Sequence, residues 1–343
     1  MSKSLAKHAG EGYKTRAGSR TKARPVAASL ALAFLLWGGA EGLARRAPSA
    51  ADSPHASARA QGERAVAYKG VGFYYDPALA SEVKAELAPP SGCGKPGDVE
   101  PAHPAFTFVG YPKPHESPFM HPPEIRVFPV AEYRRALEVC EKELAAVTIP
   151  PADYFVSSFD EEVRVLKALN AARPAPRALG GWLRARRGGG CSRRRMPLVP
   201  MYDVCEALHA KVSYVDFRNG RGVAFVTQYT IESTLITNQA LAYVFQGLTD
   251  DGEFYVSAAF PVAAPFLPPD FSEDVAARHG LDYRRGMFTP AFRRNYEAYK
   301  ARTARRLESL APDAYSPSLA PLAALLRSLN VNRDLLKSSM GLK

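Results

Sequence analysis

Residues 211–230 read KVSYVDFRNGRGVAFVTQYT, and residues 241–262 read LAYVFQGLTDDGEFYVSAAFPV. Both stretches are rich in β-branched and aromatic residues, which favour β-strands. Asn219-Gly220 interrupts the first stretch and is the dipeptide most typical of a hairpin turn, while Asp250-Asp251-Gly252 interrupts the second. The stretches therefore predict strands over 211–218, 222–230, 241–247 and 253–262. Two successive hairpins indicate an antiparallel meander and argue against a doubly wound parallel sheet.

The last of these strands shows a period of two. Its apolar residues are Phe254, Val256, Ala258, Phe260 and Val262, and they alternate with Glu253, Tyr255 and Ser257. Since successive side chains of a strand point to opposite faces, this pattern predicts one buried face and one face in contact with water.

Helices are expected on both sides of this meander in the sequence. Aromatic runs predict earlier strands over 71–75, 106–111 and 125–130, and apolar residues at helical spacing follow from Tyr133 to Leu144. A capping box, Ser158 with Glu161, predicts a second helix that Pro174 ends. A short helix is expected over 201–208, and residues 173–195 are expected to be a surface loop. The fold class is therefore α+β, an antiparallel β-sheet built from hairpins and covered by helices.

The C-terminal region is predicted to be helical. Thr289-Pro290 is a typical helix start, and a last helix is expected over 316–329. The first of these helices has a basic polar face, so it could lie on an anionic membrane. Its narrow aromatic stripe favours the other interpretation, in which it covers the sheet with its charges in water.

The N-terminal segment has the charge pattern of an export signal. Residues 1–24 carry seven basic side chains against Glu11 alone, and residues 25–40 are uncharged and mostly apolar. This apolar run is shorter than the roughly 20 residues of a membrane-spanning helix, and Gly42-Leu43-Ala44 suits cleavage after Ala44. The expected organisation is a signal peptide or retained membrane anchor over 1–44, a disordered tether over 45–66 and a single α+β domain with a helical C-terminal region over 67–343. A buried core helix is the weaker alternative for the apolar run.

The basic residues do not indicate nucleic-acid binding. The formal net charge of +11 is concentrated in the leader and in a second cluster of arginines between residues 184 and 195. The remaining chain is close to neutral, whereas a nucleic-acid surface needs basic residues spread along a groove or helix face. Gly188-Gly189-Gly190 lacks the strand before it and the Lys-Ser/Thr helix start after it that a phosphate cradle requires. The expected location is extracytoplasmic, periplasmic or secreted, with membrane contact only through the N-terminal segment and an unknown envelope or extracellular partner.

No catalytic set, metal site or cofactor site is predicted from the sequence. The residues that could bind a metal ion lie in or beside a proline-rich segment: His103, His115, His121, Glu116 and Glu124. They lack the fixed spacing on one rigid element that a metal site needs, so we interpret the histidines as surface residues. No serine lies in a G-x-S-x-G turn.

Two polar residues within the apolar pattern are of interest. His209 is expected at a helix end, partly buried or capping. Gln246 lies in an aromatic strand on the same face as Ala242 and Val244. It is a possible ligand contact if that face lines a pocket, and a water-facing side chain if it does not.

The four cysteines suggest disulfide chemistry. Cys93 and Cys191 lie next to glycines in expected loops, and exposed thiols oxidise in an exported protein. We expect both to be disulfide-bonded, to each other or to a helix cysteine. Cys140 and Cys205 lie on apolar stripes of expected helices, where burial as small hydrophobic residues is equally natural.

The second hairpin also resembles a known family. Residues 243–256 read YVFQGLTDDGEFYV, and Ile236–Leu241, Phe260–Val262, the preceding hairpin from Val215 and the strand from Gly70 are similar in the same way. Together they resemble an uncharacterised family of exported bacterial proteins, many of them lipoproteins. The resemblance covers residues 70–268 with gaps and implies export and a shared fold, but no reaction. Unlike the lipoprotein members, this chain has no lipidation cysteine after its apolar run.

Two functions from different classes follow. The sequence favours a non-enzymatic binding or interaction module outside the cytoplasm, and the alternative is an uncharacterised extracytoplasmic hydrolase. A cluster of histidine and carboxylates in one concave pocket would favour the hydrolase, whereas a sheet face with an apolar patch would favour the binding module.

Overall fold

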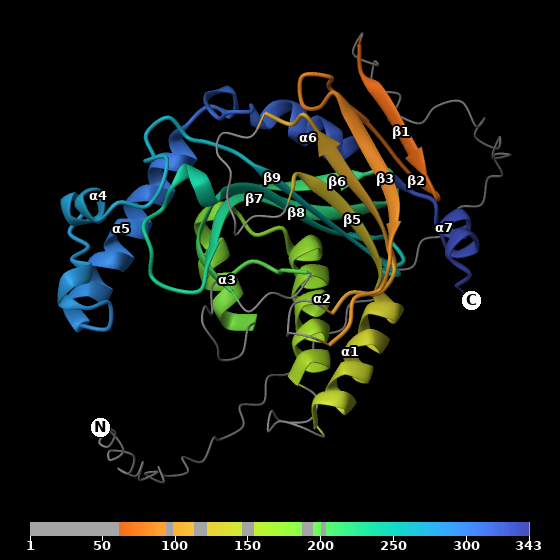
Figure 1. Ribbon diagram of the computed structural model, residues 1–343, viewed down its shortest axis with the longest axis horizontal. Coiled ribbons are helices and arrows are strands. Elements are labelled where there is room, and N and C mark those ends of the chain that lie inside the picture. The colour runs from red at the N-terminus through yellow and green to blue at the C-terminus, as the bar shows by residue number, and fades with distance from the viewer. Residues whose placement is uncertain are drawn as a thin grey trace, which may run out of the picture. The chain divides into compact units, whose positions relative to one another are not determined.

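The structure is a computed structural model that describes residues 62–93, 99–112, 122–145, 154–186, 195–199 and 204–342 (Figure 1). These residues belong to one compact unit, Ala58–Lys343. The predicted leader, most of the tether, His115, His121, Glu116 and Cys191 lie outside the described residues. No helix of the described part is long and apolar enough to cross a membrane.

The centre of the fold is a seven-stranded antiparallel sheet with the order β3-β4-β5-β9-β8-β7-β6. This confirms the predicted α+β class and places both predicted hairpins in one sheet. The strands are β3 (Glu82–Ala88), β4 (His103–Val109), β5 (Glu124–Pro129), β6 (Cys205–Phe217), β7 (Gly220–Thr230), β8 (Leu241–Thr249) and β9 (Phe254–Pro261).

The first hairpin turns one residue earlier than the sequence indicates. Phe217 pairs with Gly220, so Arg218-Asn219 forms the two-residue turn. A Cβ added at Gly220 would lie 2.5 Å from the carbonyl oxygen of Leu248, which explains why glycine occupies this position. The Asn219 side chain accepts a 3.0 Å hydrogen bond from the backbone N–H of Val331, and so connects the turn to the C-terminal region.

Both faces of the large sheet are buried. On β8, Tyr243 and Phe245 belong to one core cluster, while Val244 and Leu248 belong to a second on the opposite face. The predicted water-facing side of β9 is therefore wrong: Tyr255 is fully buried there. The reason is that helices cover this face, and one strand's alternation cannot show whether a second layer packs on it.

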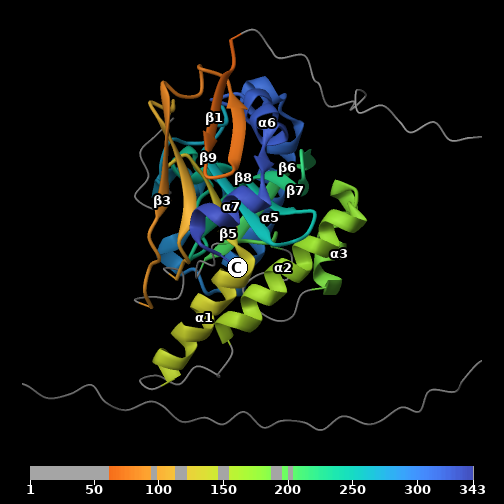
Figure 2. The same cartoon turned by 90° about the vertical axis from the view of Figure 1, so that its right-hand side faces the viewer.

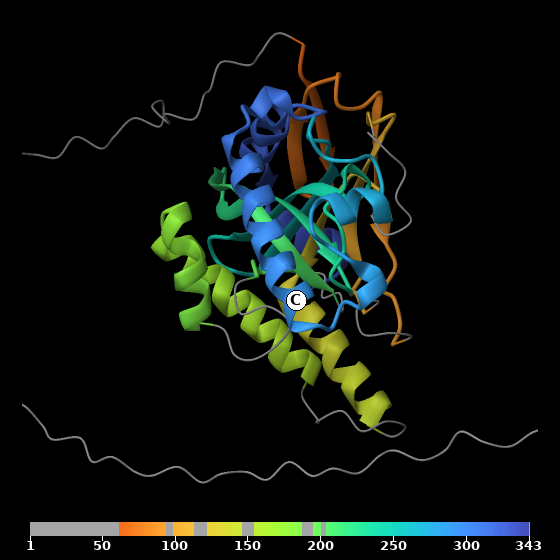
Figure 3. The ribbon, with the colours of Figure 1, turned by 90° about the vertical axis from the view of Figure 1, so that its left-hand side faces the viewer.

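Helices cover the two faces in separate groups (Figures 2 and 3). One face packs against α1 (Val130–Ala145), α2 (Tyr154–Ala172) and α3 (Pro176–Arg186). The other packs against α5 (Pro290–Ser309) and α6 (Leu319–Ser328), and the remaining helices in the described part of the chain are α4 (Glu273–Arg278) and α7 (Arg333–Met340). Helix α5 begins as predicted, with the Thr289 hydroxyl accepting from Phe292 N–H at 3.2 Å. Its aromatic stripe is buried against the sheet, which supports the covering interpretation of this basic helix.

Three stretches differ from the sequence-based predictions. Residues 173–195 contain α3, because Leu179 and Leu183 lie one turn apart and are both fully buried. A helix was expected over 201–208, but residues 205–208 begin β6, where Cys205 pairs with Thr230 of β7, and residues 201–203 lie outside the described residues. The strand β3 was not predicted at all.

A second, three-stranded sheet packs on the first. Its strands are β1 (Arg64–Tyr68), β2 (Val71–Tyr75) and β10 (Asn330–Val331), in the order β1-β2-β10. Its inner face contacts the large sheet through Phe73, whose ring centroid lies 5.3 Å from that of Phe106. Since β1 begins at Arg64, the ordered domain starts inside the segment predicted as a tether.

Candidate functional site

A buried cluster of four ionisable side chains lies at the start of β4 and along β5. It consists of Glu100, His103, Glu124 and Arg126. Residues 103, 124 and 126 come together because β4 and β5 pair antiparallel with Ala105 opposite Arg126. Glu100 reaches them from the loop before β4, where its N–H donates to the Ser91 hydroxyl at 2.8 Å.

Arg126 lies between two carboxylates. Its Nη1 is 2.6 Å from Glu100 Oε1, and its Nε is 3.1 Å from Glu124 Oε1. Its guanidinium carbon also lies 5.6 Å from the centre of the Phe128 ring. Only 9 % of the Arg126 side chain is exposed, so these charges interact with little screening by water.

His103 is held in its neutral form. Its Nδ1 lies 2.8 Å from the Pro101 carbonyl oxygen, and since a carbonyl only accepts, Nδ1 carries the proton. Burial lowers the pKa of His103 from 6.5 to about 4, and the positive charge of Arg126 contributes in the same direction. Its Nε2 is 3.6 Å from Glu100 Oε2. The imidazole also packs on Phe128, with ring centroids 4.3 Å apart.

The pKa of Glu124 is raised, so its carboxyl keeps a proton to higher pH than an ordinary glutamate does. Burial raises the pKa of its carboxyl and nearby Glu100 raises it further, while Arg126 opposes the shift. The cluster thus contains both a neutral imidazole, His103, and a carboxyl, Glu124, that protonates more readily than an ordinary glutamate. Such opposite perturbations are a feature of acid–base sites, although structural ion-pair networks also produce them.

The structure brings together only part of the predicted metal candidates. His103 and Glu124 belong to the same cluster, His103 through Glu100 and Glu124 through Arg126. His103 is buried on a strand and is not the surface loop residue that we expected. Arg126 and Glu100 were missed, although a charged residue inside the apolar run EIRVF is an available signal. Within the described residues, no group of three or more His, Cys, Asp or Glu side chains is arranged to hold a metal ion.

Gln246 is the centre of a second buried polar network. Its Oε1 accepts hydrogen bonds from the Tyr255 hydroxyl at 2.6 Å and from Val199 N–H at 3.0 Å. Its Nε2 donates to the Ser257 hydroxyl at 3.2 Å. The side chain is 1 % exposed, so the water-facing alternative is wrong. These bonds give the amide a structural role, and its role as a ligand contact stays a prediction.

Replacing Gln246 by methionine tests that structural role. The variant keeps the length of the side chain but leaves the Val199 N–H and the Tyr255 hydroxyl buried without their acceptor. We expect the free energy of unfolding, measured by urea denaturation, to fall by about 2 kcal/mol. Ser257→Ala removes only one bond and should cost about half as much. Equal stability of Gln246→Met and the unchanged chain would contradict the structural role.

Carboxylates of α2 and β6 accept hydrogen bonds from the backbone of residues 195–199 and hold this segment between the two elements. The backbone N–H of Leu198 donates to Glu162 at 3.0 Å, and that of Met196 donates to Glu206 at 2.5 Å. Glu162 also pairs with Arg195, and Glu206 lies 2.5 Å from Nδ1 of His209. His209 lies on β6 and not at the helix end that we expected. These groups anchor one segment of the chain.

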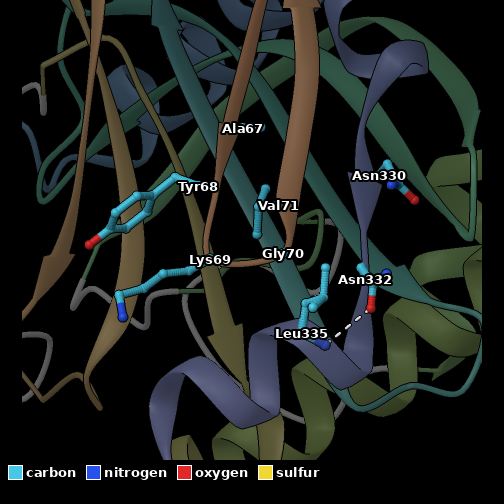
Figure 4. Close-up of a pocket in the computed structure, with 8 residues that line it drawn as sticks. All are labelled: Ala67, Tyr68, Lys69, Gly70, Val71, Asn330, Asn332 and Leu335. Carbon is cyan, nitrogen blue, oxygen red and sulfur yellow. Dashed lines mark hydrogen bonds between the residues drawn. The ribbon is translucent and has the colours of Figure 1, made fainter.

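A groove lies on the small sheet beside α7 (Figure 4). Its volume is about 320 Å³. Ala67–Val71 of the β1–β2 hairpin, with the long side chains of Tyr68 and Lys69, line one part, and the C-terminal segment lines the other with Asn330, Asn332 and Leu335. Leu335 is 59 % exposed, whereas Asn332 uses its side chain to accept from Leu335 N–H and so begins α7.

The cysteines are in two different states. Cys205 is disulfide-bonded on β6, whereas Cys93 and Cys140 are free thiols. The free thiol at Cys93 differs from the disulfide that was expected there, and Cys191 lies outside the described residues. Cys140 is fully buried on α1, in agreement with the interpretation as a small hydrophobic residue.

Comparisons with known proteins found no relative of this chain. A scan against protein-family models gave no match, and searches of curated proteins and of solved structures gave none either.

Proposed function

We propose that this protein is a non-enzymatic interaction module outside the cytoplasm, which binds an extended segment of a partner protein at the groove of the small sheet. The groove carries the proposal, because it combines an exposed apolar side chain, Leu335, with the amide of Asn330 and the side chain of Tyr68. Amide groups can pair with a peptide backbone, and an apolar wall can hold one side chain of the peptide.

The strand next to the groove supports an extended ligand. Among the described residues of the three-stranded sheet β1 pairs only with β2, so its other edge, on the side away from β10, has no strand partner there. Such an edge can receive an additional strand from another chain. On the outer face, Tyr74 of β2 is also partly exposed at 37 %.

Two features support the extracytoplasmic location. The first is the basic leader with its apolar run. The second is the disulfide at Cys205, since structural disulfides persist mainly in oxidising compartments. The resemblance to exported bacterial proteins points in the same direction.

The groove is tested by replacing Leu335 with aspartate. Because Leu335 is mostly exposed, the change should alter the free energy of unfolding by less than about 0.5 kcal/mol. Loss of its apolar contact should weaken partner binding at least tenfold, which corresponds to about 1.4 kcal/mol. A photo-reactive amino acid at position 335, introduced in the producing bacterium, cross-links the partner so that it can be identified. The affinity of that partner for the unchanged chain and for Leu335→Asp is then measured.

Phe288 is a matched control for the photo-reactive position, since it is apolar and 79 % exposed but does not line the groove. A discrete cross-linked protein is expected from position 335 and not from position 288. The same products from both positions, or no product from position 335, would contradict the proposal.

The hydrolase alternative has one observation in its favour, which is that neutral His103 and Glu124 belong to one buried cluster, with Arg126 contacting Glu124 and Glu100 contacting His103. A neutral imidazole can act as a base, and a carboxyl with a raised pKa can donate a proton. Against it, His103 is only 2 % exposed. Hydrolysis of an activated ester that falls at least 100-fold in His103→Gln, and not in His279→Gln, would favour the enzyme over the binding module.

A further inference from the structure

The connection between β3 and β4 is attached to α1 through two thiols. Cys93 lies in this connection, is half-buried, and packs against the core cluster that contains Cys140. The Cys93 thiol is hydrogen-bonded to the Cys140 thiol and to Glu143, which lies one turn further along α1. Two cysteines distant in the sequence are therefore in direct side-chain contact.

We infer that Cys93 and Cys140 form a redox-active pair that closes to a disulfide by exchange with a disulfide oxidant, and that this bond locks the β3–β4 connection onto α1. The structure holds the reduced form of the pair. The inference is independent of the proposed groove, which lies on the other sheet.

The exposure of the two cysteines decides the order of the steps. Cys140 is fully buried, so only Cys93 can meet an oxidant. Cys93 loses its proton and attacks the disulfide of oxidised glutathione, which gives a mixed disulfide and one glutathione thiolate. Cys140 then loses its proton and attacks the Cys93 sulfur, which releases the second glutathione. Two electrons and two protons leave the cysteine pair, and one oxidised glutathione becomes two reduced ones.

The environment of Cys93 makes the exchange slow at neutral pH. Burial, followed by its contacts with Cys140 and Glu143, raises the pKa of Cys93 to about 12. Because the thiolate is the nucleophile, the rate of oxidation should rise about tenfold for each pH unit between 7 and 9. This slow reaction suits a bond that forms once in an oxidising compartment.

The disulfide between Cys93 and Cys140 would also restrain the buried ionisable cluster that contains Glu100. Ser91 and Glu100 face each other across the β3–β4 connection, since Ser91 N–H donates to the Glu100 carbonyl at 3.0 Å. Glu100 in turn pairs with Arg126. A bond from Cys93 to α1 therefore restrains the segment that supplies one carboxylate of the cluster.

The test treats the full chain with oxidised glutathione, blocks remaining thiols with iodoacetamide and examines the peptides by mass spectrometry. We expect a peptide pair linked through Cys93 and Cys140, with both cysteines lost to labelling together. In Cys140→Ala the same treatment should leave a stable glutathione adduct on Cys93. A stable adduct on Cys93 in the unchanged chain, or full labelling of both cysteines, would overturn the inference.

Thermal unfolding gives a second readout that does not depend on the buried Cys140→Ala variant. The oxidised chain should unfold at a temperature about 5–10 °C above that of the chain before oxidation, because the bond closes a long loop of the unfolded state. Cys93→Ser changes only a half-buried residue and keeps the disulfide at Cys205, so the same treatment should leave its unfolding temperature unchanged. An equal shift in both proteins would refute the bond.

Discussion

Replacing Arg126 by methionine is expected to lower the free energy of unfolding at pH 7 by about 3–5 kcal/mol, the usual cost of breaking a buried ion pair from one side. The guanidinium lies 2.6 Å from Glu100 and 3.1 Å from Glu124. Methionine fills much of the volume of the arginine stem but leaves two carboxylates facing each other without a cation. Urea denaturation followed by circular dichroism measures the loss.

The pH dependence of this variant has a defined sign. Without Arg126, which lowers the pKa of Glu124, the carboxyl of the folded variant holds its proton to still higher pH. As the pH falls and the carboxyls take up protons, their repulsion disappears, so the destabilisation should shrink between pH 7 and pH 4. Adding Glu100→Gln and Glu124→Gln to the methionine variant should recover most of the loss at pH 7, since no buried charge is then left unpaired.

Arg134→Met is the matched control. Arg134 also pairs with two carboxylates, Glu138 at 2.8 Å and Asp160 at 3.2 Å, but 48 % of its side chain is exposed. Exposed pairs contribute less than about 1 kcal/mol. If Arg126→Met were no more destabilising than Arg134→Met, the buried cluster would not hold β4 and β5 together in the way described.

Local patterns predicted the parts of the fold that depend on neighbouring residues. The hairpins at 217–220 and 249–254 are local, because a turn and its flanking alternation lie within one stretch of sequence. The start of α5 is local for the same reason, since Thr289 caps it directly. Strand β3 was missed although Val83, Ala85 and Leu87 alternate with Lys84 and Glu86, because alanine, lysine and glutamate are depleted in strands and mask this alternation. The covering of the second face was missed because it depends on α1 to α3, which come from elsewhere in the chain.

The candidate site shows the same limit. His103 and Glu124 were noticed for their chemistry, but their place in one cluster depends on the register of β4 against β5. Arg126 joins them only through that register, and Glu100 through the loop that Ser91 closes. Gln246 was recognised as unusual, yet its partner Val199 comes from a segment with no periodic pattern. Contacts between residues distant in sequence, such as Cys93 with Cys140, cannot be obtained from spacing.

Acid is expected to destabilise the protein through His103. The folded-state pKa of His103 is lowered to about 4 from the ordinary value of 6.5, because the imidazole is buried beside Arg126. Between these two values the unfolded chain binds a proton at this position and the folded chain does not. The unfolded state thus gains protons as the pH falls, and the folded state loses stability in this window. A difference of about 2.5 pH units corresponds to about 3 kcal/mol.

Glu124 acts in the opposite direction, which determines how the experiment must be designed. Its folded-state pKa is raised, so the folded chain binds a proton before the unfolded chain does as the pH falls, and this partly offsets the effect of His103. The pH dependence of the stability of a single protein therefore combines the contributions of His103 and Glu124. The difference between the unchanged chain and a His103 variant, measured at each pH by urea denaturation, isolates the histidine.

His103→Asn is the variant for this comparison. An asparagine amide can still donate to the Pro101 carbonyl, which accepts from Nδ1 at 2.8 Å, but it takes up no proton between pH 7 and pH 4. We expect the unchanged chain to lose about 3 kcal/mol more than this variant over that range. In His279→Asn the corresponding difference should be smaller, because His279 is exposed and its pKa is lowered without such complete burial. Parallel curves for His103→Asn and the unchanged chain would show that the imidazole is already protonated in the folded state, and that the cluster carries one more positive charge than its geometry indicates.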